Sequence, residues 1–321
     1  MTYDEAYNHV WRGDAWAAVI AMPNASTNLH RAITNDNTTT YDSTTALTYI
    51  WNQAHWPMVA EGYITPSLEE AVDGASSLWI QTYGAALLEA TSESNLSSTG
   101  IRLLLDGFGS TSVDIQPFPI GVRPFLSTAA MVFPALLEFF FSMALRGASD
   151  ECGLPRGRLA LQRHYLLRGC AMLIFSCLMG ISWGLWHEVF HEHSGISGSQ
   201  FCLIWLTFWM YGIIAFVVYD SATAALPTFL FPPLVLTYII INVTAAAFPI
   251  PLKPAFFHLD YIWPSYNCFE LYTTILTHGS TSRVYRNVPV LFGWLIVWIP
   301  INLFLNKRRF ARDVAQLKEE E

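Results

Sequence analysis

Long apolar runs follow one another along the chain after residue 122. A helix rises 1.5 Å per residue and the hydrocarbon core of a bilayer is about 30 Å thick, so a run of about 20 apolar residues can cross it. The pattern predicts five such spans, at about residues 125–145, 169–186, 201–219, 226–248 and 288–305. We therefore expect a multispanning α-helical membrane domain over residues 123–310, followed by a tail at 311–321.

The fourth run, residues 226–248, carries two adjacent prolines near its start. Pro232 and Pro233 lack backbone N–H groups, and their rings clash with the preceding turn of a helix. In lipid, such a break persists only where protein or trapped water satisfies the backbone. The sequence therefore predicts a broken membrane helix whose break faces the helix bundle.

The first 122 residues show shorter and more varied patterns. A nearly continuous apolar run at 16–22 and a β-branched, aromatic stretch at 45–56 indicate strands, and residues 111–116 fit a third. From Pro66 onward, apolar residues recur three and four positions apart, which is typical of one face of an amphipathic helix. We expect residues 1–122 to form a mixed α/β domain.

Composition and charge favour a membrane protein. Hydrophobic residues make up 53% of the chain and charged residues only 13%, against about 25% charged residues in ordinary globular domains. The formal net charge of -8 belongs mainly to residues 1–122. This acidic balance argues against a nucleic-acid partner, which requires a basic face, and leaves the lipid bilayer as the expected partner.

Basic residues predict the orientation of the spans, because short basic loops are retained in the cytoplasm. They cluster after the first span and in the tail, at Arg146, Arg156, Arg158, Arg163, Arg168, Lys307, Arg308, Arg309 and Arg312. Alternation of the spans then places the C-terminus in the cytoplasm and residues 1–122 and 249–287 outside it.

The orientation requires that residues 1–122 be translocated, yet Met1 begins a polar stretch without a signal region. We therefore expect a further span before this sequence. Its absence reflects either a truncated gene model or a real difference in the protein. We also expect the external domain to be incomplete at its N-terminus. The external placement agrees with three glycosylation sequons, at Asn24, Asn37 and Asn95. Asn242 also begins a sequon, but it lies inside a span and should not be modified.

Residues His187 to His191 match the H-E-x-x-H pattern. In that pattern two histidines one helical turn apart bind zinc, and the glutamate, here Glu188, acts as general base. A third ligand would have to come from elsewhere, such as His258 or Glu270. The alternative is a hydrated helix end at the membrane interface, and we expect no metal or cofactor.

Glu138 is a carboxylate in the middle of a predicted span. Charged groups inside a membrane are costly and commonly mark functional sites. The alternative is a protonated or internally hydrogen-bonded glutamate that orients its helix. Glu138 is therefore the candidate functional residue within the membrane.

An ordered series of residues in the C-terminal part supports a resemblance. The series is Asn242, Pro249, Pro254, Pro264, Asn267, Arg286 and Asn287. With Trp16 to Ile20, Pro23 to Ser26 and the Val122-Arg123-Pro124 stretch, it resembles the fungal nitrosoguanidine-resistance membrane protein family. That family is related to bacterial phage-infection proteins and to the membrane subunits of type-two ABC permeases.

The resemblance implies a type-two ABC permease-like bundle, a plasma-membrane location and a role in resistance to toxic compounds. The family layout of one span, a large external domain and five more spans also implies that the first crossing is missing here. It supplies no catalytic residues to carry over.

We expect a non-enzymatic permease-like protein that supports export of, or resistance to, toxic small compounds. The chain has no phosphate-binding loop, so a partner ATPase or an ion gradient would supply energy, and a homo-oligomer is an alternative assembly. A second reading is a membrane scaffold or regulator acting through a glycosylated external domain, and a third is a zinc metalloprotease at His187 and His191.

Overall fold

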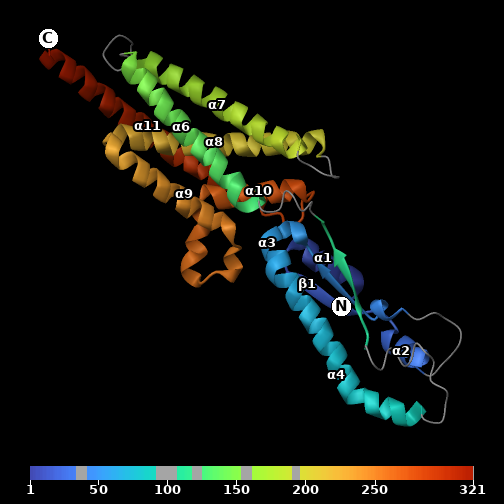
Figure 1. Cartoon of the computed structure of the whole chain (residues 1–321). Helices are drawn as coiled ribbons and strands as arrows, with labels where there is room; N and C mark the ends of the chain where they lie inside the picture. Colours follow the sequence, from blue (N-terminus) through green and yellow to red (C-terminus); the bar gives the residue numbers. More distant parts are fainter. Residues whose placement is uncertain (34–41, 92–106, 118–124, 153–160, 190–195, 321) are drawn as a thin grey trace. The chain divides into compact units, whose positions relative to one another are not determined.

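The structure, a computed structural model, describes residues 1–33, 42–91, 107–117, 125–152, 161–189 and 196–320. The chain forms two compact units, Met1–Phe118 and Pro119–Glu321. Each unit has a hydrophobic core of its own (Figure 1).

The first unit is built on a three-stranded sheet in the order β1-β2-β3. Strand β1 (Ala17–Ala21) pairs with β2 (Leu47–Trp51) in antiparallel fashion, and β3 (Ser110–Asp114) pairs with β2 in parallel. The strands predicted at 16–22, 45–56 and 111–116 are therefore present, each shorter than predicted.

The alternation of side chains along β2 divides the core of this unit into two clusters. Tyr49 and Trp51 pack with Val72 on one side of the sheet, and Ile50 packs with Ala6 and Val10 on the other. Successive residues of a strand point to opposite faces. One strand therefore binds the helices on both sides.

Helix α1 (Tyr3–Arg12) is an element that the apolar pattern did not predict. Its start is fixed by a capping box, in which the Thr2 side chain and the Glu5 side chain satisfy each other's backbone N–H groups. Its end is fixed by Gly13, whose φ of 73° suits glycine. Helix α2 (Ala25–Ile33) follows β1.

A continuous helical segment follows β2 and the 3₁₀ turns around it. Helix α3 (Pro57–Val59) and a π-helical turn (η3, Ala60–Ile64) lead into α4 (Thr65–Thr91). The predicted amphipathic helix is therefore present, but its predicted apolar face is buried only in part. Val72 is 3% exposed, whereas Leu78 and Tyr83 are 63% and 55% exposed.

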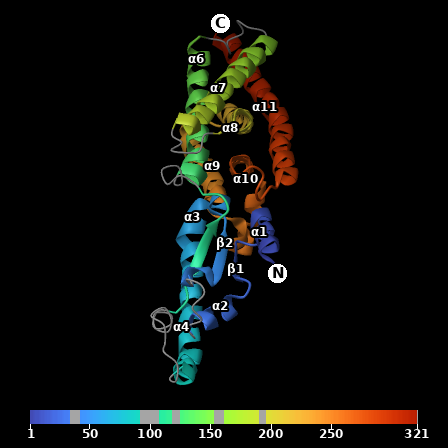
Figure 2. The ribbon, with the colours of Figure 1, turned by 90° about the vertical axis from the view of Figure 1, so that its right-hand side faces the viewer.

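The second unit is a bundle of helices (Figure 1, Figure 2). The apolar helices that are long enough to cross a membrane occupy Ser127–Glu151, Leu161–Val189, Gly198–Ala225 and Val284–Ala315. They correspond to α6 (Ala130–Glu151, preceded by a π-helical turn, Phe125–Ala129), α7 (Leu161–Val189), α8 (Gly198–Ala225) and α11 (Val284–Glu320). Helix α8 contacts α6, α7, α11 and the two shorter helices described below, α9 (Phe231–Ala247) and α10 (Pro264–Leu276).

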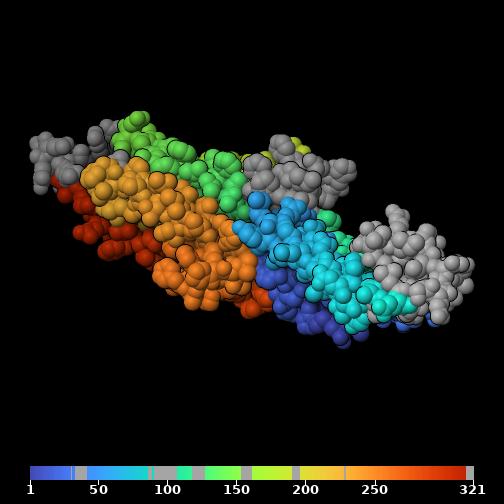
Figure 3. All heavy atoms as spheres, turned by 60° about the horizontal axis from the view of Figure 1, so that its bottom comes forward, coloured from blue at the N-terminus to red at the C-terminus, as the bar shows by residue number. Residues whose placement is uncertain are grey.

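The fourth predicted span differs from the structure. Helix α9 runs over Phe231–Ala247, only 17 residues, after a 3₁₀ turn at Thr228–Leu230. Pro232 and Pro233 lie in its first turn. The N–H groups of a first turn have no partner within the helix, so proline costs no helical hydrogen bond there. Both prolines are exposed, so the predictions of a broken helix and of a break facing the bundle are wrong. Figure 3 shows α9 and the segment after it, in golden and orange shades, covering one face of the bundle.

The segment predicted as an external connection, residues 249–287, contains helix α10 (Pro264–Leu276). Every residue of α10 except Glu270 and Ile275 is buried, and the helix packs against α8, α9 and α11. The segment therefore contributes to the core of the bundle instead of forming a simple loop on it. Two 3₁₀ helices, Ile250–Leu252 and Ala255–Ile262, precede α10.

Candidate functional site

Glu138 lies on α6 in the interior of the bundle. Its side chain is completely buried, at 0% exposure. Within the described part of the chain, neither carboxylate oxygen has a hydrogen-bond partner. A charged carboxylate in such surroundings is costly, so this position favours binding of a proton or of another cation.

Three helices meet beside Glu138. A Cβ atom placed on Gly212 of α8 would lie 2.8 Å from Glu138 Oε1, 3.2 Å from Ser176 Cβ and 2.6 Å from Met179 Cε. Ser176 and Met179 belong to α7. The glycine thus makes room for the carboxylate between α6, α7 and α8.

Other buried polar atoms of the bundle also have no hydrogen-bond partner among the described residues. They include the hydroxyl groups of Ser176, Tyr219 and Tyr238, and the Tyr219 and Tyr238 rings are in edge contact with centroids 5.5 Å apart. Buried polar atoms are almost always hydrogen-bonded in proteins. Their concentration around α6 to α9 marks this region as a candidate functional site.

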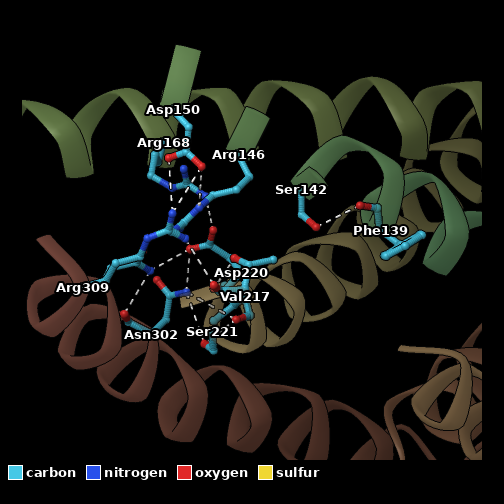
Figure 4. A network of polar contacts seen from close by, with 12 residues as sticks. Phe139, Ser142, Arg146, Asp150, Arg168, Val217, Asp220, Ser221, Asn302 and Arg309 are labelled. Carbon is cyan, nitrogen blue, oxygen red and sulfur yellow. Dashed lines mark hydrogen bonds and ion pairs between the residues drawn. The ribbon is translucent and has the colours of Figure 1, made fainter. Parts of the chain in front are cut away.

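A second polar group lies nearer the C-terminal end of α8 and is centred on Asp220 (Figure 4). Asp220 is 2% exposed and forms an ion pair with Arg168 of α7. Its other oxygen accepts hydrogen bonds from Asn302 Nδ2 at 2.9 Å and Asn306 Nδ2 at 2.8 Å, both on α11. This network joins α7, α8 and α11.

The position of Arg168 corrects one step of the sequence analysis. The basic loop after the first span was assigned five arginines, but Arg146 lies on α6 and Arg163 and Arg168 lie on α7. Arg168 is 7% exposed. It therefore acts inside the bundle as a partner of Asp220 and is not a loop residue.

Asn242 and Ser265 explain part of the C-terminal series. Helix α10 begins after Trp263, which cannot cap it, and Pro264 occupies its first position. Asn242 Oδ1 of α9 accepts a hydrogen bond from the Ser265 N–H at 3.4 Å, and the Ser265 hydroxyl donates to the Asn242 carbonyl. Asn242 thus replaces the missing cap, since the first N–H groups of a helix have no partner within it.

The turns between α9 and α10 are held by further polar contacts. Lys253 Nζ donates to the carbonyl groups of Thr244 at 2.8 Å and Ala245 at 3.2 Å, near the end of α9. It also pairs with Asp260 at 2.7 Å. Pro249 and Pro254 precede the two 3₁₀ helices, and Asn267 Nδ2 donates to the Tyr261 and Trp263 carbonyls at 2.8 and 2.9 Å.

Arg286, at the start of α11, closes the other side of α10. It pairs with Glu270, which also accepts a hydrogen bond from the Tyr266 hydroxyl. Its guanidinium lies 4.5 Å from the centre of the Tyr261 ring, and its Nε donates to Asn287 Oδ1 at 3.3 Å. The C-terminal series therefore caps and connects helices.

The alternative zinc site at His187 and His191 lies only partly within the described residues. His187 is buried, with Nδ1 3.2 Å from the Tyr272 hydroxyl, while His191 lies outside the described residues. Glu270, considered as a further ligand, is paired with Arg286. Among the residues that the structure describes, no group of three His, Cys, Asp or Glu side chains could hold a metal ion.

The structure describes only one of the three predicted glycosylation sites. Asn24 is exposed and has a φ of 61°, whereas Asn37 and Asn95 fall outside the described residues. Asn242 is 1% exposed, which agrees with the prediction that its sequon should not be modified.

An apolar groove of about 970 Å³ lies between α7, α8, α10 and α11. Leu203, Met210 and Val288 line it, with Gln200 and Thr207 among its few polar residues. A concave, mostly apolar surface with a few polar groups is the usual form of a small-molecule site. The sequence analysis did not predict this groove.

The fold and these sites define a multispanning helical membrane protein. The chain belongs to the family described as "Protein of unknown function (DUF3533)", which matches residues 2–299. It is similar to an uncharacterised endoplasmic reticulum membrane protein of Saccharomyces cerevisiae, YJR015W, with 21% identity over 327 residues, 95% of this chain and 59% of that protein. No solved structure matches the chain.

Two features of the bundle were not predicted, and only one of them has a signal in the sequence. Gly180 and Gly184 form a G-x-x-x-G pattern, which commonly marks a helix contact in membranes. A Cβ atom on Gly180 would lie 2.9 Å from the Trp205 carbonyl oxygen, so α7 and α8 pack backbone to backbone there. The pairing of Arg168 with Asp220, 52 residues apart, had no local signal.

Proposed function

We propose that this protein is a non-enzymatic, permease-like membrane protein that exports toxic lipophilic compounds or protects against them. The observation that carries the proposal is the buried Glu138 carboxylate, whose oxygens have no partner within the described part of the bundle. Protonation or a cationic compound would neutralise it, and such a group is a common device for coupling transport to a proton or ion gradient.

The apolar groove supports the same proposal. Its volume, about 970 Å³, is near the upper end of known small-molecule sites. The resemblance to the nitrosoguanidine-resistance family provides the compound class, and a homo-oligomer or a partner ATPase would complete the transporter. We propose a plasma-membrane location from the same resemblance, whereas the yeast relative is named as an endoplasmic reticulum protein.

An efflux assay in cells that lack related proteins tests the proposal. Glu138→Gln removes the charge, and Glu151→Gln makes the same change at an exposed position on the same helix. At matched expression, we expect loss of compound export with Glu138→Gln and normal export with Glu151→Gln. Export that is the same with and without the wild-type protein would reject transport.

The groove is tested separately in the same assay. Val288→Trp fills part of it, while Val297→Trp places the same side chain at a position on α11 that is 56% exposed. We expect reduced export of bulky compounds with Val288→Trp alone. Equal effects would show that the groove does not bind the compounds.

The scaffold reading remains the second candidate because Met1–Phe118 is a compact unit with its own core. A scaffold should tolerate Glu138→Gln and lose function when this unit is deleted. Treatment with an endoglycosidase tests the proposed external placement. A mobility shift that disappears in Asn24→Gln would place this unit on the non-cytoplasmic side.

A further inference from the structure

A cavity of about 400 Å³ lies at the end of the bundle where α6 and α8 terminate. Its charged residues come from two helices that are far apart in the sequence. They are Arg146 and Asp150 of α6, and Arg309, Arg312 and Asp313 of α11. Three guanidinium groups thus line one partly open cavity together with two carboxylates.

The carboxylates in this cavity are mainly engaged by Arg309. Its Nη2 donates to both oxygens of Asp150 at 3.3 Å, and its Nε lies 3.5 Å from Asp313. Its Nη1 also donates to the Thr223 carbonyl at 3.2 Å. Arg309 therefore contacts both carboxylates of the cavity.

Arg146 is left with donors to spare. It lies 3.6 Å from Asp150, too far for a good hydrogen bond, and its side chain is only 12% exposed. Its Nε and Nη2 are buried and have no hydrogen-bond acceptor among the described residues. A buried guanidinium in this state is costly unless an anion accepts from it.

Arg312 adds a second donor at the mouth of the cavity. It is exposed, and its Nη2 donates a hydrogen bond to the Ala224 carbonyl at 3.2 Å. A planar guanidinium can donate in several directions at once. Arg146 inside and Arg312 outside can therefore reach one anionic group from two sides.

Apart from Thr223, the rest of the cavity wall is apolar. Met143, Leu226, Pro227 and Phe231 line it, and the neighbouring Phe229 is 76% exposed. A site that is basic on one side and apolar on the other matches an amphiphile with an anionic head group. Basic pockets between membrane helices bind lipid head groups in this way.

We propose that this cavity binds a phosphate group, with the phosphomonoester head group of a membrane lipid as the source that the apolar wall favours. Phosphate oxygens would accept hydrogen bonds from Arg146 Nε and Nη2 and from Arg312, since guanidinium and phosphate form strong charge-assisted pairs. The two carboxylates repel anions from the part of the cavity that Arg309 occupies. A phosphate group is therefore expected to bind at Arg146 and to leave the Arg309 ion pairs intact.

The test uses the purified full chain in lipid nanodiscs of phosphatidylcholine, alone or with phosphatidic acid. The thermal unfolding midpoint and native mass spectrometry report binding. We expect phosphatidic acid to raise the midpoint of the wild type. Arg146→Gln and Arg312→Gln should each lower the apparent affinity at least about tenfold, as expected for loss of one charge-assisted hydrogen bond.

Arg308→Gln is the matched control, because Arg308 is exposed on α11 and does not line the cavity. It should bind phosphatidic acid as the wild type does. Arg312→Gln keeps the test valid if Arg146→Gln does not fold, since Arg312 lies at the surface.

A second arm titrates inorganic phosphate into the protein in lipid-free detergent. The site would be assigned to a soluble phosphate if phosphate alone raises the unfolding midpoint of the wild type but not of Arg146→Gln, and if phosphatidic acid adds no further stabilisation. If neither probe distinguishes the wild type from Arg146→Gln and Arg312→Gln, or if Arg308→Gln loses as much, the proposal is overturned.

Discussion

Glu138 of α6 and Gly212 of α8 lie so close that a methyl group at position 212 would be 2.8 Å from Glu138 Oε1. The glycine is therefore required by the carboxylate as well as by helix packing. This relationship joins the candidate functional residue to the central helix of the bundle.

Gly212→Ala should destabilise the bundle by about 1–3 kcal/mol, the usual cost of overpacking a core. Thermal unfolding in detergent measures the effect. In a Glu138→Ala background the same substitution should cost less, because the Oε1 atom is gone, although Met179 Cε at 2.6 Å still has to move. An identical cost in both backgrounds would show that Glu138 and Gly212 are not coupled.

Gly180→Ala should weaken the contact between α7 and α8. Its Cβ would lie 2.9 Å from the Trp205 carbonyl oxygen and 3.0 Å from the Trp209 nitrogen, and backbone atoms cannot easily retreat. We expect a loss of about 1–3 kcal/mol. Gly169→Ala is the control on the same helix, since nothing lies within 4 Å of its Cβ. It should be neutral or stabilise by up to about 1 kcal/mol through helix propensity, and similar losses for both variants would contradict the close packing.

Arg168→Met should destabilise the protein by about 3–5 kcal/mol, because it leaves the buried Asp220 without its cation. Asp220→Asn should also destabilise it. The double variant should lose less than the sum of the two single variants, with a coupling of about 1 kcal/mol or more. If chemical denaturation shows that the losses of the two single variants simply add, Arg168 and Asp220 are not coupled. The hydrogen bonds from Asn302 and Asn306 would then be sufficient to stabilise the Asp220 carboxylate.

Asp114 provides a pH-dependent prediction for the first unit. Burial raises its pKa above the usual value, although its carboxylate accepts hydrogen bonds from the Gln53 and Gln116 N–H groups. The folded state therefore binds the proton more tightly than the unfolded state. Stability is highest below the unfolded pKa and falls as the pH rises through the folded pKa.

Asp114→Asn keeps an oxygen acceptor and removes the charge. Hydrogen exchange of the β2 amides, compared with the wild type at each pH, should show equal or greater protection at neutral pH. The difference should shrink in acid, where the wild-type carboxyl is protonated. Greater protection of the wild type at neutral pH would show that the charged Asp114 carboxylate stabilises the fold, contrary to this prediction.

The apolar pattern predicted most of the bundle because long apolar helices need no partner to be recognised. It failed at α9, since prolines that begin a helix look the same in sequence as prolines that break one. It also missed α10, whose buried Asn267, Ser265 and Thr273 read as a polar loop. Ser265 bonds to Asn242, 23 positions earlier in the sequence, and only the three-dimensional packing supplies that partner. Asn267 and Thr273 donate to nearby carbonyl groups between Tyr261 and Glu270.

Helix α1 could have been predicted from its capping box at Thr2 and Glu5. Glu138 was singled out from its position in an apolar run, and the structure places its side chain in the interior of the bundle. Its functional role stays a prediction. The cavity formed by Arg146 and Arg312 could not be predicted. It depends on the end of α6 meeting the last turns of α11, 166 positions later in the sequence.

Helix α9 has a further consequence for the surrounding lipid. Its 17 residues extend over about 26 Å at 1.5 Å per residue, and they expose Leu236 and Ile240 by 60% and 53%. Hydrophobic mismatch costs a fraction of a kcal/mol per Å, and thinning of the bilayer relieves it. A bilayer that spans α9 alone would have to compress at this face, and thin membranes would accommodate the helix with the least deformation.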